Sequence, residues 1–172
     1  MKTQNDVSTE KEVFIKMIVG AWETQNTRIN KLLETLSEEQ LMSETAPGRN
    51  RGVYLVGHLT AVSDGMLPIL GWGERLYPRL ENAFVTQPDK AVADLPTLAD
   101  VKKYWQSVNA NITERINNMQ PDEWFGRHNS VSAEDFAKEP HRNKLNILVN
   151  RTNHLSYHLG QLAYLGKRKS ED

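Results

Sequence analysis

The sequence predicts an all-α fold, a four-helix bundle with one long crossover connection. Three observations predict it. In four segments, apolar residues recur every three or four positions, the period of an amphipathic helix. Capping and helix-breaking residues separate these segments. No two segments alternate apolar and polar residues as a β hairpin does. The 172 residues are expected to form a single domain, 1–172, with a flexible N-terminus at 1–9.

The first two helices are expected over about Glu10–Leu36 and Val53–Met66, with a short capped segment after Ser37. Pro68 should end or kink the second helix. The apolar stripe of the first helix is expected at Phe14, Ile18, Trp22, Gln25, Ile29, Leu32 and Leu36.

The second half of the chain predicts two more long helices. One runs over Thr97–Met119 with Thr97 as its N-cap, and the last begins with Pro140 at its first position and ends near Gly166. The long stretch Tyr77–Leu95 is expected to cross over, with at most one short helical turn. Residues Gly126–Glu139 are expected to be irregular, after a short turn that carries Trp124 and Phe125.

Composition excludes several classes of site. The chain has no cysteine, which excludes disulfides, thiolate zinc sites and a cysteine nucleophile, and fits a reducing cytoplasm. With 21 basic and 22 acidic residues well mixed, no nucleic-acid-binding patch is expected. The polar start of the chain lacks the apolar core of a signal peptide, and no apolar run is expected to span a membrane. We expect a cytoplasmic protein.

Two of the five histidines, His154 and His158, lie four residues apart on the last expected helix. At that spacing both rings leave the same face, and two imidazoles can bind one divalent cation at about 2.0–2.1 Å. The alternative is that both are histidines at the edge of the core, satisfied by Asn, Ser or backbone groups. Spacing alone does not choose between these interpretations, because His-x3-His without Glu is a loose signal.

His58 strengthens the metal interpretation. It occupies the centre of an apolar face on the second expected helix, where an aliphatic residue would pack better. One ligand from one helix and two from another is how bundle cores build metal sites. Three neutral histidines would leave one position open for water or substrate, as in catalytic sites. His128 and His141 are expected to be solvated or capping residues, and Asp64 a surface group or a support for the ligands.

Gly57-His58-Leu59 together with His154-x3-His158-Leu159-Gly160-Gln161 resembles the DinB/YfiT-like family of metal-dependent enzymes. The resemblance covers nearly the whole chain in helix order and spacing. It implies a four-helix bundle with a crossover, a homodimer, and His58, His154 and His158 as ligands of zinc or nickel. Many members have arginine where this chain has Leu159, which leaves the role of that arginine unsupported here.

The resemblance implies a thiol S-transferase or hydrolase that acts on a small electrophilic substrate, with a low-molecular-weight thiol as a possible partner. Substrate contacts are expected among Asn150, Arg151, Tyr157 and Gln161. The alternative is a non-catalytic helical module for metal binding or dimerisation, in which the four tryptophans supply either a core or an interface.

Overall fold

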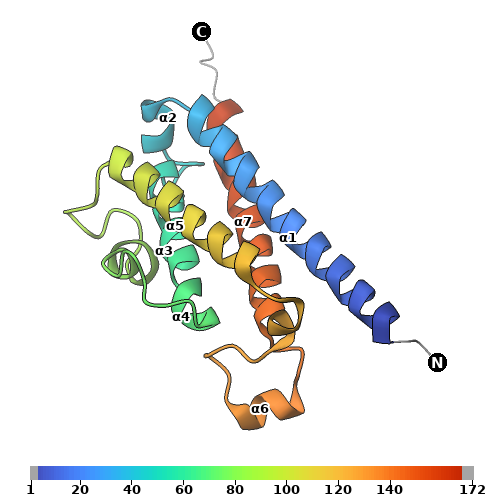
Figure 1. Ribbon diagram of the computed structural model, residues 1–172. Helices are drawn as coiled ribbons and strands as arrows, with labels where there is room; N and C mark the ends of the chain where they lie inside the picture. The colour runs from blue at the N-terminus through green and yellow to red at the C-terminus, as the bar shows by residue number, and fades with distance from the viewer. Residues whose placement is uncertain (1–3, 168–172) are drawn as a thin grey trace.

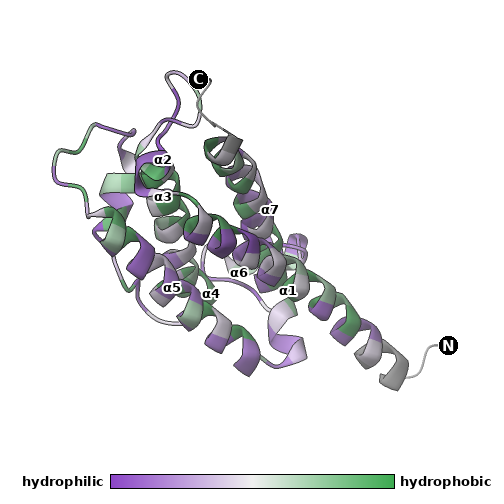
Figure 2. Ribbon diagram, turned by 90° about the horizontal axis from the view of Figure 1, so that it is seen from above, coloured by the Kyte–Doolittle hydropathy of each residue, from purple (hydrophilic) through white to green (hydrophobic). Residues whose placement is uncertain are grey.

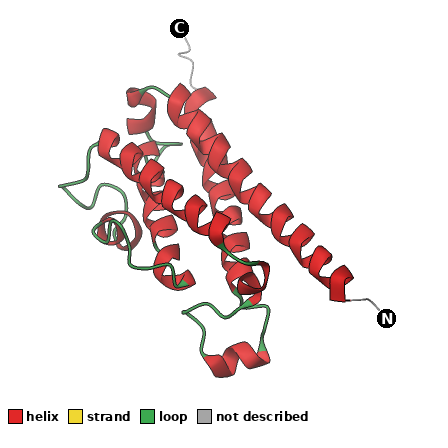
Figure 3. Cartoon of the chain, viewed as in Figure 1, coloured by secondary structure: helices red, strands yellow, loops and turns green. Residues whose placement is uncertain are grey.

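The computed structural model describes residues 4–167 of the chain, with side chains described from residue 9 to residue 166. The prediction of an all-α fold is confirmed. The described residues hold two isolated β-bridges, Glu44–Arg51 and Arg127–Asn143, and no strand (Figure 3). Both bridges close loops, so neither builds a sheet.

Four long helices carry the fold: α1 (Gln4–Thr35), α3 (Gly52–Asp64), α5 (Leu98–Asn118) and α7 (Lys144–Ala163). α1 lies along α7, and α3 packs against both α5 and α7 (Figure 1). α3 is therefore the central helix, and nearly every one of its side chains is buried. The site histidines come from α3 and α7.

Six short helical segments complete the chain. They are α2 (Glu38–Met42), α4 (Met66–Leu70), the π-helix η1 (Asn82–Thr86), and the 3-10 helix η2 (Pro121–Phe125), followed by α6 (Ala133–Lys138) and the 3-10 helix η3 (Tyr164–Lys167). η1 packs on α3 within the connection from α4 to α5, where the sequence predicted at most one short turn of helix.

The predicted caps and stripes are largely confirmed. Ser37 and Gln40 form a reciprocal capping box at the start of α2, and the Thr97 hydroxyl accepts a hydrogen bond from the Asp100 amide. In Figure 2 the ribbons of α1 and α5 carry both hydrophilic and hydrophobic bands, as amphipathic helices do. The buried residues of α5 recur every three or four positions, as an amphipathic helix requires: Leu98, Val101, Trp105, Val108, Ile112 and Ile116.

Helix α1 corrects two expectations. It begins at Gln4 rather than near Glu10, and Phe14 is 55% exposed although it was placed in the core stripe. The next residue, Ile15, packs against the core instead, so Phe14 lies on the face of α1 that is turned away from it, although the N-terminal turns of α1 lie beside α7 and its neighbours (Figure 1). Residues 1–3 lie outside the described residues, and the flexibility of 1–9 stays a prediction.

The break in the second predicted helix lies at Gly65 rather than at Pro68. α3 ends at Asp64, and Pro68 lies inside α4, which ends at Gly71 in the left-handed conformation (φ 75°). Proline is tolerated in the first turn of a helix because the missing N–H would have no partner there.

The start of the last helix was predicted wrongly. α7 begins at Lys144, not at Pro140, and its N-cap is Asn143, whose side chain accepts a hydrogen bond from the Asn146 amide. The stretch expected to be irregular contains α6, capped by Ser132. Ser132 and Asn143 mark the two starts in the sequence, because each N-cap side chain accepts a hydrogen bond from an amide in the first turn of its helix.

One stretch, Gly52–Leu70, is long and apolar enough by composition to cross a membrane, with a mean hydropathy of 1.3. This corrects the expectation that no apolar run is long enough. However, 78% of this apolar stretch is buried inside the fold, as in the core helix of a globular protein. It forms the centre of the helical domain.

Asp64 is fully buried at the end of α3, which contradicts its assignment as a surface group. Its two carboxylate oxygens accept hydrogen bonds from the backbone amides of Leu76 (2.8 Å) and Tyr77 (2.9 Å). Asp64 therefore ties the connection that leads to η1 onto the end of the central helix.

We expect Asp64→Ala to lower the free energy of unfolding by about 2–4 kcal/mol, because two backbone amides lose their acceptors and a fully buried side chain is truncated. Asp64→Asn should cost less, since its amide oxygen can still accept one bond. Urea denaturation measures both, with the exposed Asp94→Ala as control. A loss for Asp64→Ala no larger than for the control would contradict this anchoring role.

Candidate metal centre

The three predicted histidines meet at the seam between α3 and α7. The Nε2 of His154 lies 3.2 Å from the Nε2 of His58 and 3.0 Å from the Nε2 of His158. One ligand nitrogen from each ring lies within 4.8 Å of the others. The rings cross at steep interplanar angles of 72° to 81°, so their nitrogens converge instead of stacking.

Two hydrogen bonds set the tautomers of His58 and His158, the two rings on either side of His154. The Nδ1 of His58 lies 2.7 Å from the carbonyl oxygen of Phe84, and the Nδ1 of His158 lies 2.7 Å from the amide oxygen of Gln161. Both oxygens can only accept, so each Nδ1 carries the proton and donates it. The Nε2 of His58 and the Nε2 of His158 therefore present lone pairs toward His154.

This arrangement fits a metal ion. The Nε2 of His154 can donate a proton to only one of the two facing lone pairs, whereas one cation satisfies all three nitrogens. Imidazoles bound to tetrahedral zinc at about 2.0–2.1 Å stand about 3.3 Å apart, close to the two distances found here. Metal-binding histidines commonly donate Nδ1–H to a carbonyl or amide oxygen, as His58 and His158 do. The three histidines thus form a group that could hold a metal ion.

Two of the three histidines are held neutral mainly by burial. The pKa of His154 is lowered to about 4, chiefly by burial and in smaller measure by the charges of His158, His58 and Arg151. Burial also lowers the pKa of His158, against the opposing effect of the Gln161 hydrogen bond. Neutral imidazole is the form that binds metal, so little competition from protons is expected at pH 7.

Two of the four expected substrate-contact residues adjoin the cluster. Gln161 holds His158, and its Nε2 donates to the Tyr157 hydroxyl (3.3 Å). Tyr157 is 64% exposed, and its ring centroid lies 5.0 Å from that of His158. These two residues mark the solvent side of the site.

The other two expected contact residues differ from each other. Arg151 is mostly buried one turn before His154 on α7, and the two side chains interact electrostatically. Asn150 is exposed, and no hydrogen bond in the described part of the chain joins it to the cluster. Asn150 is therefore the one expected residue that the fold does not bring to the site.

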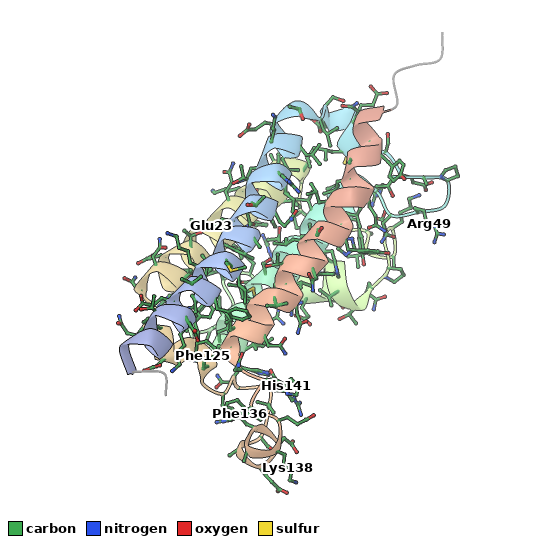
Figure 4. The ribbon with its side chains drawn as sticks, turned by 90° about the vertical axis from the view of Figure 1, so that its right-hand side faces the viewer. Glu23, Arg49, Phe125, Phe136, Lys138 and His141 are labelled. Atoms are coloured by element: carbon green, nitrogen blue, oxygen red, sulfur yellow. The ribbon has the colours of Figure 1, made fainter. Side chains whose placement is uncertain are left out.

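Neither remaining histidine joins the cluster. His128 is buried, contrary to the expected solvated position, and its Nδ1 accepts a hydrogen bond from the Ser130 amide within the loop that precedes α6. His141 is exposed beside α6, on the excursion that hangs from the long helices (Figure 4). Both therefore lie apart from the group formed by His58, His154 and His158.

Sequence reasoning missed the residues that orient His58. Phe84 in η1 is fully buried, and its backbone carbonyl accepts the hydrogen bond from the Nδ1 of His58. Every residue has such a carbonyl, so the residue type gives no signal for this contact. Tyr54, one turn before His58, stacks near its ring at 6.4 Å and donates its hydroxyl proton to the Gln87 carbonyl. The spacing of Tyr54 and His58, four residues apart on one helix, is a sequence signal that predicts contact between their rings.

Comparison with known protein families matches residues 21–162 to the DinB superfamily. The chain belongs to the DinB superfamily. The matched region includes all three site histidines and most of the chain. A search of the curated proteins finds no match. The family resemblance inferred from the histidine motifs is confirmed.

Gly57 is required for this geometry. A Cβ at Gly57 would lie 2.4 Å from the Phe84 ring, so Gly57→Ala should displace Phe84 and with it the carbonyl that orients His58. We expect metal affinity to fall about 10–100-fold and stability by about 1–3 kcal/mol. Competition with a chromophoric chelator and urea denaturation measure these effects.

Gly160→Ala is the matched helical control, because nothing lies within 4 Å of a Cβ there. It should leave metal affinity unchanged and raise stability by up to about 1 kcal/mol. Equal metal affinity in Gly57→Ala and Gly160→Ala would show that Phe84 does not orient the ligand.

The lowered pKa of His154 predicts a pH dependence for the metal-free protein. Between about pH 6.5 and 4 the unfolded chain protonates this imidazole and the folded protein does not. The unfolded state then binds more protons, so stability falls as the pH falls. After allowance for solvent screening, we expect a loss of about 1–2 kcal/mol attributable to His154. Urea denaturation at several pH values, compared with His154→Gln, isolates this contribution; identical slopes in both proteins would refute it.

Proposed function

We propose that this chain is a metal-dependent enzyme whose metal is held by His58, His154 and His158. The observation that carries the proposal is the convergence of three Nε2 atoms, two of them shown by their Nδ1 partners to be unprotonated. Membership of the DinB superfamily supports it. Three protein ligands would leave a coordination position for a further group, as in catalytic rather than structural sites.

The proposed reaction is thiol S-transfer or hydrolysis on a small electrophilic substrate. A bound zinc or nickel ion would lower the pKa of a coordinated thiol or water and so supply a nucleophile at neutral pH. The low-molecular-weight thiol is the proposed partner for the transferase. This part of the proposal rests on the family resemblance and on the position that three protein ligands leave for a further group.

The chain's own residues would hold and orient the reactants. Phe84 and Gln161 fix the ring planes of two ligands, which keeps their lone pairs aimed at one point. Tyr157, exposed beside His158, presents a hydroxyl that can donate to a substrate while it accepts from Gln161. We propose Tyr157 and Gln161 as substrate contacts, and Asn150 only at the outer edge of the site.

Further properties follow from the family resemblance as proposals. The four long helices would form the four-helix bundle of the family, with the crossover between α4 and α5. We also propose a cytoplasmic homodimer that acts on a small molecule and needs neither nucleic acid nor membrane.

The competing proposal is a non-catalytic helical module that binds metal or dimerises. One observation weakens its dimerisation form: Trp22, Trp105 and Trp124 are buried, and Trp72 packs edge-on against Trp124. The tryptophans therefore build the core of one chain and leave little of their area for an interface.

Metal removal tests the enzyme. We expect near-stoichiometric metal in the purified protein and none in His158→Ala, because the loss of one of three ligands leaves a weak pair. The exposed His141→Ala is the matched control and should bind metal fully. Elemental analysis measures the metal, and conjugation of a low-molecular-weight thiol to a fluorogenic electrophile measures turnover.

Turnover should disappear with the metal in His158→Ala and persist in His141→Ala. Full turnover in metal-free His158→Ala would refute the metal mechanism. Stoichiometric metal without turnover on any thiol or hydrolysable electrophile would favour the non-catalytic module.

A further inference from the structure

Arg151 is a largely buried arginine, and no described residue supplies a counter-charge to its guanidinium. Its Nε is shielded from solvent and has no hydrogen-bond partner, and no ion pair or hydrogen bond to its side chain is found among the described residues. Burial lowers its pKa, and the charge of Arg75 adds to that effect. Because a buried charge without a partner is costly, such an arginine needs a reason to be retained.

The neighbouring acidic groups are already used. Glu81 pairs with Arg75, whose Nη1 also donates to the Ala61 carbonyl. Asp64 is bound by two backbone amides. The chain therefore supplies no free carboxylate to Arg151 in the described part of this region.

Arg151 lies on the site side of α7. It precedes His154 by three residues, which makes the two side chains neighbours on one helix face, about 4.5 Å apart along the axis. The interaction between the Arg151 charge and the His154 imidazole is consistent with this placement. The unpaired guanidinium thus lies next to the position where three histidines converge.

We propose that Arg151 is the anion-binding residue of this site, and that the substrate carries a carboxylate or phosphate group beside its reacting atom. The guanidinium fork matches both oxyanions, and charge-assisted bonds to a buried arginine are among the strongest available. The inference rests on the proposed function for its substrate, but the anion subsite exists without the metal. Arg151 would set specificity by orienting the anionic end of the electrophile toward the metal ligands.

The test measures anion binding by the metal-free protein, so that no metal can bind the probe. Inorganic phosphate and succinate are titrated separately, and binding is followed through the arginine Nε–H resonances of ¹⁵N-labelled protein. The signal of Arg151 is identified by its loss in Arg151→Lys. The two probes distinguish a phosphate-bearing substrate from a carboxylate-bearing one.

We expect at least one probe to shift the Arg151 resonance, and Arg151→Gln to weaken its binding about tenfold or more. Arg49→Gln is the matched control, because Arg49 is exposed on a loop away from α7 (Figure 4). It should change the affinity by less than about twofold. An unmoved Arg151 resonance with both probes, or equal affinity in the two glutamine variants, overturns the proposal.

Arg151→Met gives a second readout. If the guanidinium is kept for a ligand, its replacement by a flexible apolar side chain should raise the Tm of the anion-free protein by about 2–5 °C. The stabilisation by added anion should disappear at the same time. A fall in Tm on this substitution would show that the arginine is structurally satisfied, and would overturn the proposal.

His158→Ala separates this inference from the proposed function. Anion binding that persists in this variant while metal is lost supports the subsite independently of the metal. If wild-type protein binds metal and turns over a thiol but binds neither probe through Arg151, the anion subsite is wrong and the proposed enzyme stands. Anion binding by Arg151 in a protein that never takes up metal supports the subsite and refutes the proposed metal-dependent activity.

Discussion

The hydrogen bond from His58 to the Phe84 carbonyl is the interaction on which the site depends. It requires Phe84 to lie against α3, and Phe84 can do so because Gly57 has no side chain. The same carbonyl determines which nitrogen of His58 carries the proton. A single close approach of η1 to the central helix therefore decides the position, tautomer and ligand capacity of the upstream histidine.

The connection that contains η1 is held down at several points. Asp64 binds the amides of Leu76 and Tyr77 at its beginning, and the Tyr54 hydroxyl binds the Gln87 carbonyl at its end. Two residues after Gln87, the carboxylate of Asp89 pairs with Arg51 at 2.6 Å. A long connection without regular packing of its own is thus anchored on both sides of the residue that orients His58.

The treatment of buried charge differs sharply across the molecule. Arg51 has Asp89, and the guanidinium beside the carboxyl lowers the pKa of Asp89 against the effect of its burial. In the histidine cluster, burial is the main cause that lowers the pKa of His154 to about 4, so this imidazole is neutral at pH 7. Arg151 is largely shielded from solvent, and among the described residues its guanidinium has no counter-charge and its Nε no hydrogen-bond partner. That contrast is why its charge points to a ligand rather than to the fold.

Periodicity and caps in the sequence determined the long helices, since each amphipathic stripe must be buried and each N-cap satisfies its own first turn. They also determined that His154 and His158 share a face, because that follows from helical geometry alone. Tertiary structure decided the rest. The Phe84 carbonyl could not be predicted, because a backbone oxygen carries no residue signature. Whether Phe14 or Ile15 faces the core depends on how α1 is rotated against its partner helices. The meeting of His58 with His154, 96 residues away in the chain, and with His158 depends on how α3 packs on α7. The lack of a partner for Arg151 in the described part of the chain depends on which carboxylates the fold has already engaged.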